Sequence, residues 1–403
     1  MRVNKNISYI FLALVSISLL LSFSCSKPTR TALPGHLIDE AEIIAMPGVR
    51  DWGDEYSQVF QDDAELSIKQ YIDQRPEGKS YDEVELNVLA LSGGGSNGAF
   101  SVGLLNGWQA EGSLPEFKLV TGISTGSLIA PFAFLGGKYV PQIGQLYTNI
   151  TTDQILKQES LFSIIKGTPY IADTTPLAEL MERVIDEQML NDIAKAHREG
   201  RRLFIGTTNL DAQRLVIWNM GAIANSDHPD ALELFRKILR ASASMPIAFP
   251  PMMFEVKAGD SFYDEMHVDG GASAEVFFYG DLIDIDKAHD DLKLNEKPTA
   301  RIFILRSGQF KHKYKEVDMS LISIAGKTAT SLTSSQGIGD LYRIYAISQR
   351  DGIDYNVAAV PDDFESQATE PFDPKDMKRL YKIGYDMAIN GYPWQKYPPG
   401  YQP

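Results

Sequence analysis

The sequence is poor in cysteine and histidine. Its 403 residues include one cysteine, Cys25, and six histidines. A single cysteine excludes a disulfide framework. No cluster of His, Cys, Asp or Glu stands at metal-ligand spacing, so we predict no metal and no cofactor.

Positive charge is also scarce, since 38 lysines and arginines stand against 53 acids, a net charge of −15. This balance disfavours nucleic acid as a partner and disfavours electrostatic docking on anionic bilayers. The sequence shows no internal repeat. Beyond the first 25 residues it has no apolar run long enough to span a bilayer.

The N-terminus differs in kind from the rest. A basic start precedes an apolar run over residues 7–23, the layout of a secretory signal peptide. Cys25 follows, which suggests a bacterial lipoprotein box and a lipid anchor in the cell envelope, on the periplasmic or surface side. Ser22 and Phe23 depart from the usual box, so soluble secretion and an uncleaved anchor stay open.

Gly122-Ile123-Ser124-Thr125-Gly126 is a G-x-S-x-G pentapeptide. It follows the strand-like residues 117–120 and opens onto an apolar run of helix length, residues 128–135. A strand, a glycine-flanked serine and a helix in that order are typical of a nucleophile elbow, whose tight turn exposes the serine. Ser124 is therefore the candidate nucleophile, although this short pattern also arises by chance.

A glycine loop lies upstream of the elbow. The strand-like residues 84–91 lead into Ser92-Gly93-Gly94-Gly95-Ser96-Asn97-Gly98 and then an apolar, helix-like run. Successive glycines at a helix N-terminus expose N–H groups where the helix dipole favours an anion. We predict that Gly93, Gly94 and Gly95 form an oxyanion hole, in which one donor contributes roughly 3–4 kcal/mol.

These motifs resemble the patatin-like phospholipase family. Its third element, an Asp-Gly-Gly or Asp-Gly-Ala that supplies the partner of the serine, is present as Asp269-Gly270-Gly271, and residues 241–251 resemble the segment before it. The resemblance covers roughly residues 84–308. Asn97 stands where the family usually has a basic residue, so any role of that charge does not transfer. The motif glycines are Gly98, Gly122, Gly126, Gly270 and Gly271.

The resemblance implies a serine lipid acyl hydrolase, either a phospholipase A or a lysophospholipase-like esterase. Ser124 would attack an acyl ester, Asp269 would accept the serine proton, and water would release the fatty acid from an acyl-enzyme. An aspartate of ordinary pKa, about 3.9, is a poor base for a hydroxyl, but burial would raise that pKa. Membrane contact would come from the lipid anchor or from an apolar rim around the site. The oligomeric state stays open.

Other interpretations compete with the dyad. In a Ser-His esterase the base would be His267, which shares a strand face with Asp269. A non-catalytic lipid-binding or scaffold protein could keep the same fold. Gly93 to Gly98 also fits a dinucleotide fingerprint, but the next strand ends without the acid that holds the ribose. Phe132 and Phe134 either line an acyl pocket or pack in the core.

The alternation of strands and helices predicts an α/β domain with a mainly parallel sheet, and the resemblance implies a three-layer α/β/α sandwich. Residues 202–210 and 214–218 read as a hairpin, residues 301–305 as a buried strand, and residues 175–200, 231–241 and 373–390 as helices. Residues 141–200 form either a cover over the sheet or a lid over the site. We expect four segments: a signal peptide with a lipoprotein box (1–25), an acidic tether and N-terminal extension (26–83), the catalytic domain (84–310) and a mainly helical extension (311–403). The N-terminal extension is expected to contain a helix near residues 56–71.

Overall fold

The computed structural model describes residues 30–74, 85–159, 170–278, 282–294, 297–311, 313–314 and 316–402. The expected signal peptide and lipoprotein cysteine, Cys25, lie outside these residues. Within the described ranges, no helix combines the length and hydropathy needed to cross a membrane.

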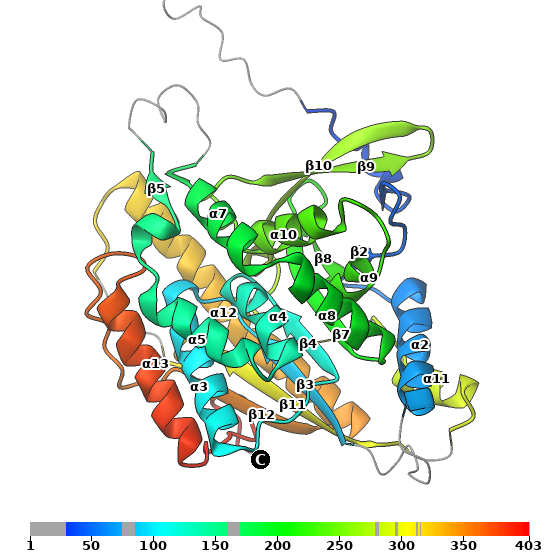
Figure 1. Ribbon diagram of the computed structural model, residues 1–403. Coiled ribbons are helices and arrows are strands. Elements are labelled where there is room, and N and C mark those ends of the chain that lie inside the picture. Colours follow the sequence, from blue (N-terminus) through cyan, green and yellow to red (C-terminus); the bar gives the residue numbers. More distant parts are fainter. Residues whose placement is uncertain are drawn as a thin grey trace, which may run out of the picture.

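A mixed sheet forms the centre of the described chain (Figure 1). Its strands are β1 (Glu42–Ile43), β2 (Arg50–Trp52), β3 (Glu85–Leu91), β4 (Leu119–Gly122), β7 (Arg202–Asn209), β8 (Arg214–Asn219), β9 (Met252–Ala258), β10 (Ser261–Asp269), β11 (Thr299–Arg306) and β12 (Asp354–Ala359). The strand order is β1-β9-β10-β7-β4-β3-β11-β12, with β8 on β7 and β2 on β8. The neighbours from β7 through β4, β3 and β11 to β12 run parallel, and the other pairs are antiparallel. A separate pair joins β5 (Lys157–Gln158) to β6 (Ala172–Asp173).

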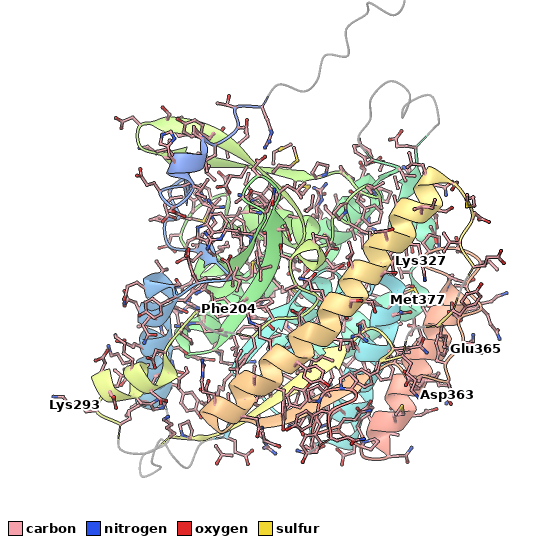
Figure 2. The ribbon with its side chains drawn as sticks, turned by 180° about the vertical axis from the view of Figure 1, so that it is seen from behind. Phe204, Lys293, Lys327, Asp363, Glu365 and Met377 are labelled. Atoms are coloured by element: carbon pink, nitrogen blue, oxygen red, sulfur yellow. The ribbon has the colours of Figure 1, made fainter. Side chains whose placement is uncertain are left out.

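Helices cover both faces of this sheet. They are α2 (Gln58–Gln74), α3 (Gly98–Glu111), α4 (Thr125–Leu135), α5 (Tyr139–Asn149), α7 (Thr175–Val184), α8 (Glu187–Arg198), α9 (Met220–Ala224), α10 (Ala231–Ser242), α11 (Ile285–Asp291), α12 (Leu321–Asp351) and α13 (Pro374–Ile389). Short 3-10 turns are η1 (Gly35–Leu37), η2 (Gly95–Asn97), η3 (Thr152–Gln154) and η4 (Gly270–Ala272). Figure 2, from behind, shows α12 lying across the sheet on the face opposite α3, α4 and α5.

The core has two sides because successive strand residues point to opposite faces. Along β3, Leu89 and Leu91 join the cluster under α3, α4 and α10, whereas Val88 and Ala90 pack with residues of α12. A parallel strand buried on both faces needs a continuous apolar run, which β3 has. The expected three-layer α/β/α fold with a mostly parallel central sheet is confirmed.

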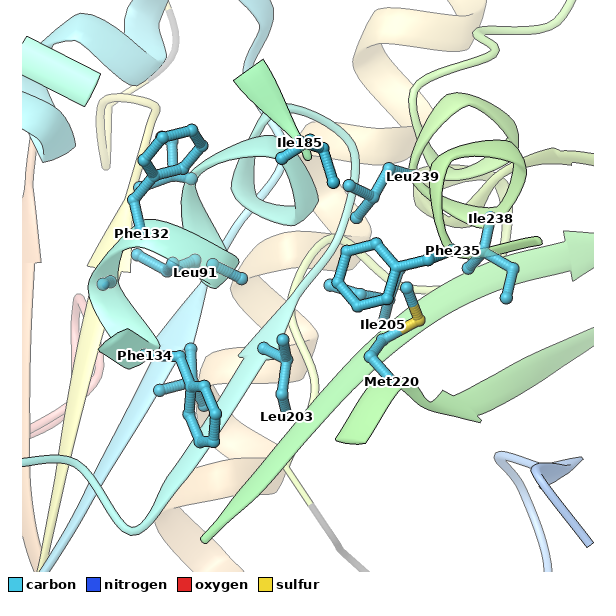
Figure 3. Close-up of a cluster of buried hydrophobic side chains, with 14 of the residues drawn as sticks. Leu91, Phe132, Phe134, Ile185, Leu203, Ile205, Met220, Phe235, Ile238 and Leu239 are labelled. Atoms are coloured by element: carbon cyan, nitrogen blue, oxygen red, sulfur yellow. The ribbon is translucent and has the colours of Figure 1, made fainter. Parts of the chain in front are cut away.

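Phe132 and Phe134 belong to the larger core cluster (Figure 3). Both side chains are fully buried on α4, among residues such as Leu203 and Phe235. The structure therefore supports core packing for these two rings, not the lining of an acyl pocket.

The N-terminal extension differs from the expected tether. From Arg30 onward the chain follows the sheet, where β1 pairs with β9 and β2 pairs with β8. The acids of this extension pair with arginines of the central domain. Asp54 lies 2.5 Å from Arg214, and Asp63 lies 2.7 Å from Arg202. These ion pairs form only when the fold brings distant segments together. Composition alone could not show them, and it therefore favoured a solvated tether for this extension. The expected helix near residues 56–71 is present as α2.

The helix expected over residues 175–200 is two helices, α7 and α8. Asp186 begins the second, and its carboxylate accepts the N–H of Met189 at 2.9 Å. The expected N-cap of α7 also shifts, from Thr175 to Thr174. Both helices lie on the face that carries α4 (Figure 1), as a cover would. Residues 160–169 of the expected cover lie outside the described ranges.

The hairpin of β7 and β8, the buried strand β11 and the helix α10 are present as expected. In α13, Asp373 caps the N-terminus by accepting the N–H groups of Lys375 and Asp376, and Gly391 follows the end with a positive φ of 80°. The segment after residue 310 is less separate than expected. It contributes β12, which extends the central sheet beside β11.

Candidate active site

Ser124 occupies a strained turn between β4 and α4. Its φ and ψ are 55° and −126°, in a region that residues with side chains seldom adopt. The turn packs so tightly that a Cβ at Gly126 would lie 2.3 Å from the carbonyl oxygen of Leu91, and one at Gly122 would lie 2.6 Å from that of Gly126. These glycines therefore permit the elbow that the pentapeptide predicts.

Asp269 reaches Ser124 because two strands meet end to end along one edge of β7. β4 runs parallel to β7 and its last residue, Gly122, pairs with Ile205. β10 arrives from the opposite direction, and its last residue, Asp269, pairs with Thr207. The carboxyl ends of β4 and β10 thus face each other across a short stretch of β7. The structure brings the two predicted dyad residues together.

The Asp269 carboxylate is held by the backbone and faces the nucleophile. It accepts the N–H of Gly271 at 2.7 Å, and the Ser124 hydroxyl lies near enough to favour its ionised form. The side chain is buried, and burial raises the pKa of Asp269 to about 6, although the Ser124 hydroxyl and the Gly271 N–H act to lower it. Gly270 packs against β7, where a Cβ would lie 2.5 Å from the carbonyl oxygen of Gly206. A carboxylate whose pKa lies near neutrality is a better general base than an ordinary aspartate.

The glycine loop lies beside the elbow, but its three N–H groups are not equivalent. Gly93 packs on Ser124, and its N–H donates to the carbonyl oxygen of Glu275 at 3.0 Å. Among the described residues, the N–H groups of Gly94 and Gly95 donate to no protein acceptor. The N–H of Gly93 is therefore engaged in this conformation, and the predicted oxyanion hole stays a prediction for Gly94 and Gly95.

Two serines to which the sequence assigned no role hold this backbone in place. The N–H of Ser124 donates to Ser242 Oγ at 3.0 Å, and Ser242 Oγ donates to the carbonyl oxygen of Gly206 at 2.7 Å. Ser92 Oγ accepts the N–H of Ser307 at 2.9 Å. Gly94, with φ 153°, leaves no room for a Cβ, which would lie 2.1 Å from the carbonyl oxygen of Ser307. Gly98 opens α3 beside Thr125.

A buried ion pair supports the loop from behind. Arg306 Nε donates to Glu275 at 2.9 Å, and both side chains are almost completely shielded from solvent. The N–H of Glu275 donates to Asp340 Oδ2 at 2.7 Å, which links the pair to α12. Burial raises the pKa of Asp340 to about 6. Sequence reasoning missed this ion pair and Asp340 because they lie in no recognisable motif. It also gave no role to Ser92 and Ser242, although both lie in segments that it singled out.

His267 is turned to a different network. Its Nδ1 lies 2.9 Å from Thr207 Oγ1, and its Nε2 lies 3.1 Å from Glu265 Oε2. Trp218 Nε1 donates to Thr207 Oγ1 at 2.7 Å, so the hydroxyl proton points to Nδ1 and Nε2 carries the proton of a neutral ring. Burial lowers the pKa of His267, which favours that neutral form. With both nitrogens engaged, this histidine is not arranged as the base of a triad.

Other features of the described chain lie apart from the dyad. The described residues contain no group of three or more His, Cys, Asp or Glu side chains arranged to hold a metal ion. A cavity of about 170 Å³ lies between α3 and the C-terminal segment, lined by residues such as Trp108 and Trp394. Neither dyad residue lines it.

Two known proteins are similar in sequence to part of this chain. Uncharacterized protein R571 of Acanthamoeba polyphaga mimivirus is 31% identical over 192 residues, which cover 46% of this chain and 60% of that protein. The cUMP-AMP-activated phospholipase of Escherichia coli is 33% identical over 109 residues, which cover 26% of this chain and 31% of that protein. The chain therefore spans less than two thirds of the length of either relative.

Solved structures show weaker likeness. VipD from Legionella pneumophila is 12% identical with a TM-score of 0.37, over 76% of this chain and 66% of that chain. Human GIVD cytosolic phospholipase A2 is 10% identical with a TM-score of 0.36, over 87% of this chain and 65% of that chain. Likeness at this level has no bearing on function.

The family match covers the site itself. The model described as Patatin-like phospholipase matches residues 89–279. That range begins within β3 and contains the glycine loop, the elbow at Ser124 and the turn after Asp269. The close packing of these three elements is the local evidence that agrees with the match. Residues 89–279 of this chain are a patatin-like phospholipase domain.

Proposed function

We propose that this protein is a serine lipid acyl hydrolase, a phospholipase A or a lysophospholipase-like esterase, that acts through a dyad of Ser124 and Asp269. One observation carries the proposal. The hydroxyl of a serine held at a strained elbow lies beside a buried carboxylate whose pKa is raised to about 6. The family match supports lipid as the substrate class.

In the first half of the reaction, Ser124 Oγ attacks the acyl carbonyl carbon while Asp269 accepts the hydroxyl proton. The oxyanion that forms is stabilised by the N–H groups of Gly94 and Gly95, and the N-terminal end of α4 adds a partial positive charge at Ser124. The ester bond then breaks, and the leaving alcohol takes the proton from Asp269. The acyl group remains on Ser124.

In the second half, a water molecule attacks the acyl-enzyme and Asp269 accepts one of its protons. The bond to Ser124 Oγ breaks, the proton returns to that oxygen, and the fatty acid leaves. Asp269 thus acts as base and acid in turn, and no histidine is required. The N–H of Gly93 stays on Glu275 and holds the loop against the elbow.

The deciding experiment compares hydrolysis of a soluble p-nitrophenyl ester and a labelled phospholipid by wild type, Ser124→Ala and His267→Gln. We expect Ser124→Ala to lose activity on both substrates and His267→Gln to keep most of it, with thermal unfolding confirming that each variant is folded. Full activity of Ser124→Ala would contradict the nucleophile. An inactive wild type that still binds lipid would favour a non-catalytic lipid-binding protein with this fold, and selective loss in His267→Gln would favour a Ser-His esterase.

We also propose that Cys25 carries a lipid anchor and holds the protein in a bacterial cell envelope. The support is the sequence layout alone, a basic start and an apolar run before a single cysteine. Incorporation of labelled palmitate in wild type and not in Cys25→Ala is the expected result. Equal labelling of both proteins would contradict it.

A further inference from the structure

The N-terminal turns of α12 expose apolar side chains. Met319, just before the helix, and Leu321 and Leu332 within it are 97%, 85% and 66% exposed. Leu321 and Leu332 lie on the same side of the helix, because eleven residues make about three turns. Figure 2 shows this end of α12, marked by Lys327, at the edge of the molecule.

The same helix contacts the turn that holds Asp269. The methyl group of Thr333 lies 3.8 Å from where a Cβ would stand at Gly271, and Gln336 donates from its side chain to the carbonyl oxygen of Ser273. Leu332 therefore lies one residue from a contact with the dyad's own turn. At 1.5 Å per residue, Leu321 lies roughly 17 Å farther along the helix. The exposed turns begin at the site and extend away from it.

A second apolar segment follows a residue that is hydrogen-bonded to the Asp269 backbone. The carbonyl oxygen of Ser244 accepts the N–H of Asp269 at 2.9 Å, and Met245 and Ile247, which follow, are both about half exposed. Ile247 has a φ of 73°, which is strongly disfavoured for a β-branched residue. Strain of this kind occurs at functional sites.

The segment that leads into the exposed apolar turns of α12 carries a positive net charge, unlike the whole chain. Residues 311–327 contain four lysines and two acids, a local charge of +2, in a chain of net charge −15. Tyr314, in the same segment, is almost completely exposed. Apolar and aromatic side chains beside lysines are typical of segments that lie in the interface of an anionic bilayer.

We propose that these residues dock the protein on a lipid bilayer and so bring substrate from the membrane to Ser124. The α12 docking surface consists of Met319, Leu321, Ile324 and Leu332, with Met245 and Ile247 at its catalytic end. This inference rests on the proposed lipid acyl hydrolysis. A hydrolase whose substrate lies in a bilayer needs an apolar surface near its nucleophile to contact that bilayer. The surface acts independently of any lipid on Cys25.

Contact with the bilayer can be measured at one position of the full-length chain. Cys25→Ser removes the only cysteine, Ser124→Ala prevents hydrolysis, and Leu332→Cys accepts an environment-sensitive fluorophore. The matched control carries the label at Leu66→Cys, an exposed leucine of α2. Vesicles of phosphatidylcholine and phosphatidylglycerol should shift the emission of the label at 332 to the blue and leave the label at 66 unchanged.

Three outcomes of that measurement would overturn the inference. They are no shift at 332, equal shifts at both positions, and a shift at 332 that appears without vesicles as protein concentration rises. The last outcome would assign the surface to a second copy of this chain. None of them depends on catalysis, so they leave the proposed hydrolysis untouched.

Hydrolysis supplies a second, separate readout. Leu321→Ser/Leu332→Ser should lower the rate on phospholipid vesicles by about tenfold, because two exposed leucines together contribute at least ~1.4 kcal/mol of burial. The rate on a soluble ester should not change. The control double variant Val59→Ser/Leu66→Ser, on α2, should match wild type on both substrates. Equal losses on vesicles and soluble ester would refute docking, whereas a wild type inactive on both would refute the proposed function.

Discussion

Asp269 and Glu265 lie on the same strand, β10, and both side chains are buried, yet their pKa values move in opposite directions. Burial raises the pKa of Asp269 to about 6, because the groups beside its carboxylate, the Ser124 hydroxyl and the Gly271 N–H, carry no charge. Burial also acts to raise the pKa of Glu265, but the hydrogen bond with His267 and the charge of Arg50 outweigh it and lower the pKa to about 2.

Burial alone therefore does not make a catalytic base. Glu265 has a cationic partner, so it stays ionised and ties β10 to β2 through Arg50. The groups that act on Asp269 are uncharged, so its carboxylate keeps a high affinity for the proton that a serine must release. The presence or absence of a charged neighbour therefore decides whether a buried acid of β10 stays ionised and supports the sheet, as Glu265 does, or can serve as a base, as we propose for Asp269.

The largest expected contrast is in activity. Asp269→Asn removes the base, so kcat/KM on a soluble ester should fall about 10²–10⁴-fold. Glu265→Gln leaves Ser124 and its partner in place, so the folded fraction of that variant should keep activity of the same order as wild type. Comparable losses in both variants, measured on protein shown to be folded, would remove the distinction between the two acids.

Glu265→Gln, which should have little effect on activity, should have a large effect on stability. Glu265→Gln leaves Arg50 buried beside a neutral partner and should lower the free energy of unfolding by about 3–5 kcal/mol. Urea unfolding at neutral pH measures this loss. As the control, Asp211→Asn breaks the more exposed pair with Arg30 and should cost only about 0–1 kcal/mol.

The raised pKa of Asp269 also makes a prediction about stability. The native carboxyl binds protons more tightly than the unfolded one, so its contribution is fully present below its ordinary pKa of 3.8 and is lost as pH rises through about 6. Relative to Asp269→Asn, wild type should therefore lose about 2 kcal/mol between pH 4 and pH 8. Urea unfolding of both proteins at the two pH values tests this, and Asp340 contributes equally to both. A constant difference would mean that Asp269 is not perturbed.

The pH dependence of activity should reflect the same group. Asp269 must be ionised to accept the serine proton, so kcat/KM should rise with pH through an apparent pKa of about 6 and fall about tenfold from pH 7 to pH 5. A profile controlled by a group of pKa near 4 would indicate an unperturbed base. Stability measured at each pH separates loss of activity from unfolding.

The smallest expected effect concerns the backbone under the dyad. Ser242→Ala removes the acceptor of the Ser124 N–H and should lower stability by about 1 kcal/mol, with a several-fold loss of kcat/KM. Ser261→Ala, at the exposed start of β10, provides the control. If Ser242→Ala changed neither stability nor kcat/KM, the strained turn at Ser124 would not depend on the hydrogen bond to Ser242.

Much of the fold was predictable because its signals are local. The buried run of β3, the hairpin of β7 and β8 and the capped helix α13 each follow from periodicity and end residues within one short window. The prediction failed where a contact is distant. The acids of the N-terminal extension pair with arginines far along the chain, and β12 forms a strand beside the edge that β11 offers.

By itself, the sequence determined the elbow and the glycine loop, since a turn that admits no Cβ leaves its mark as glycine at fixed spacing. The pairing of Ser124 with Asp269 came from resemblance. Only the tertiary structure decided the raised pKa of Asp269, the pairing of His267 with Glu265, and the engagement of the Gly93 N–H by Glu275. Burial and hydrogen-bond geometry depend on which strands meet at which edge, and that information is not present in any one motif.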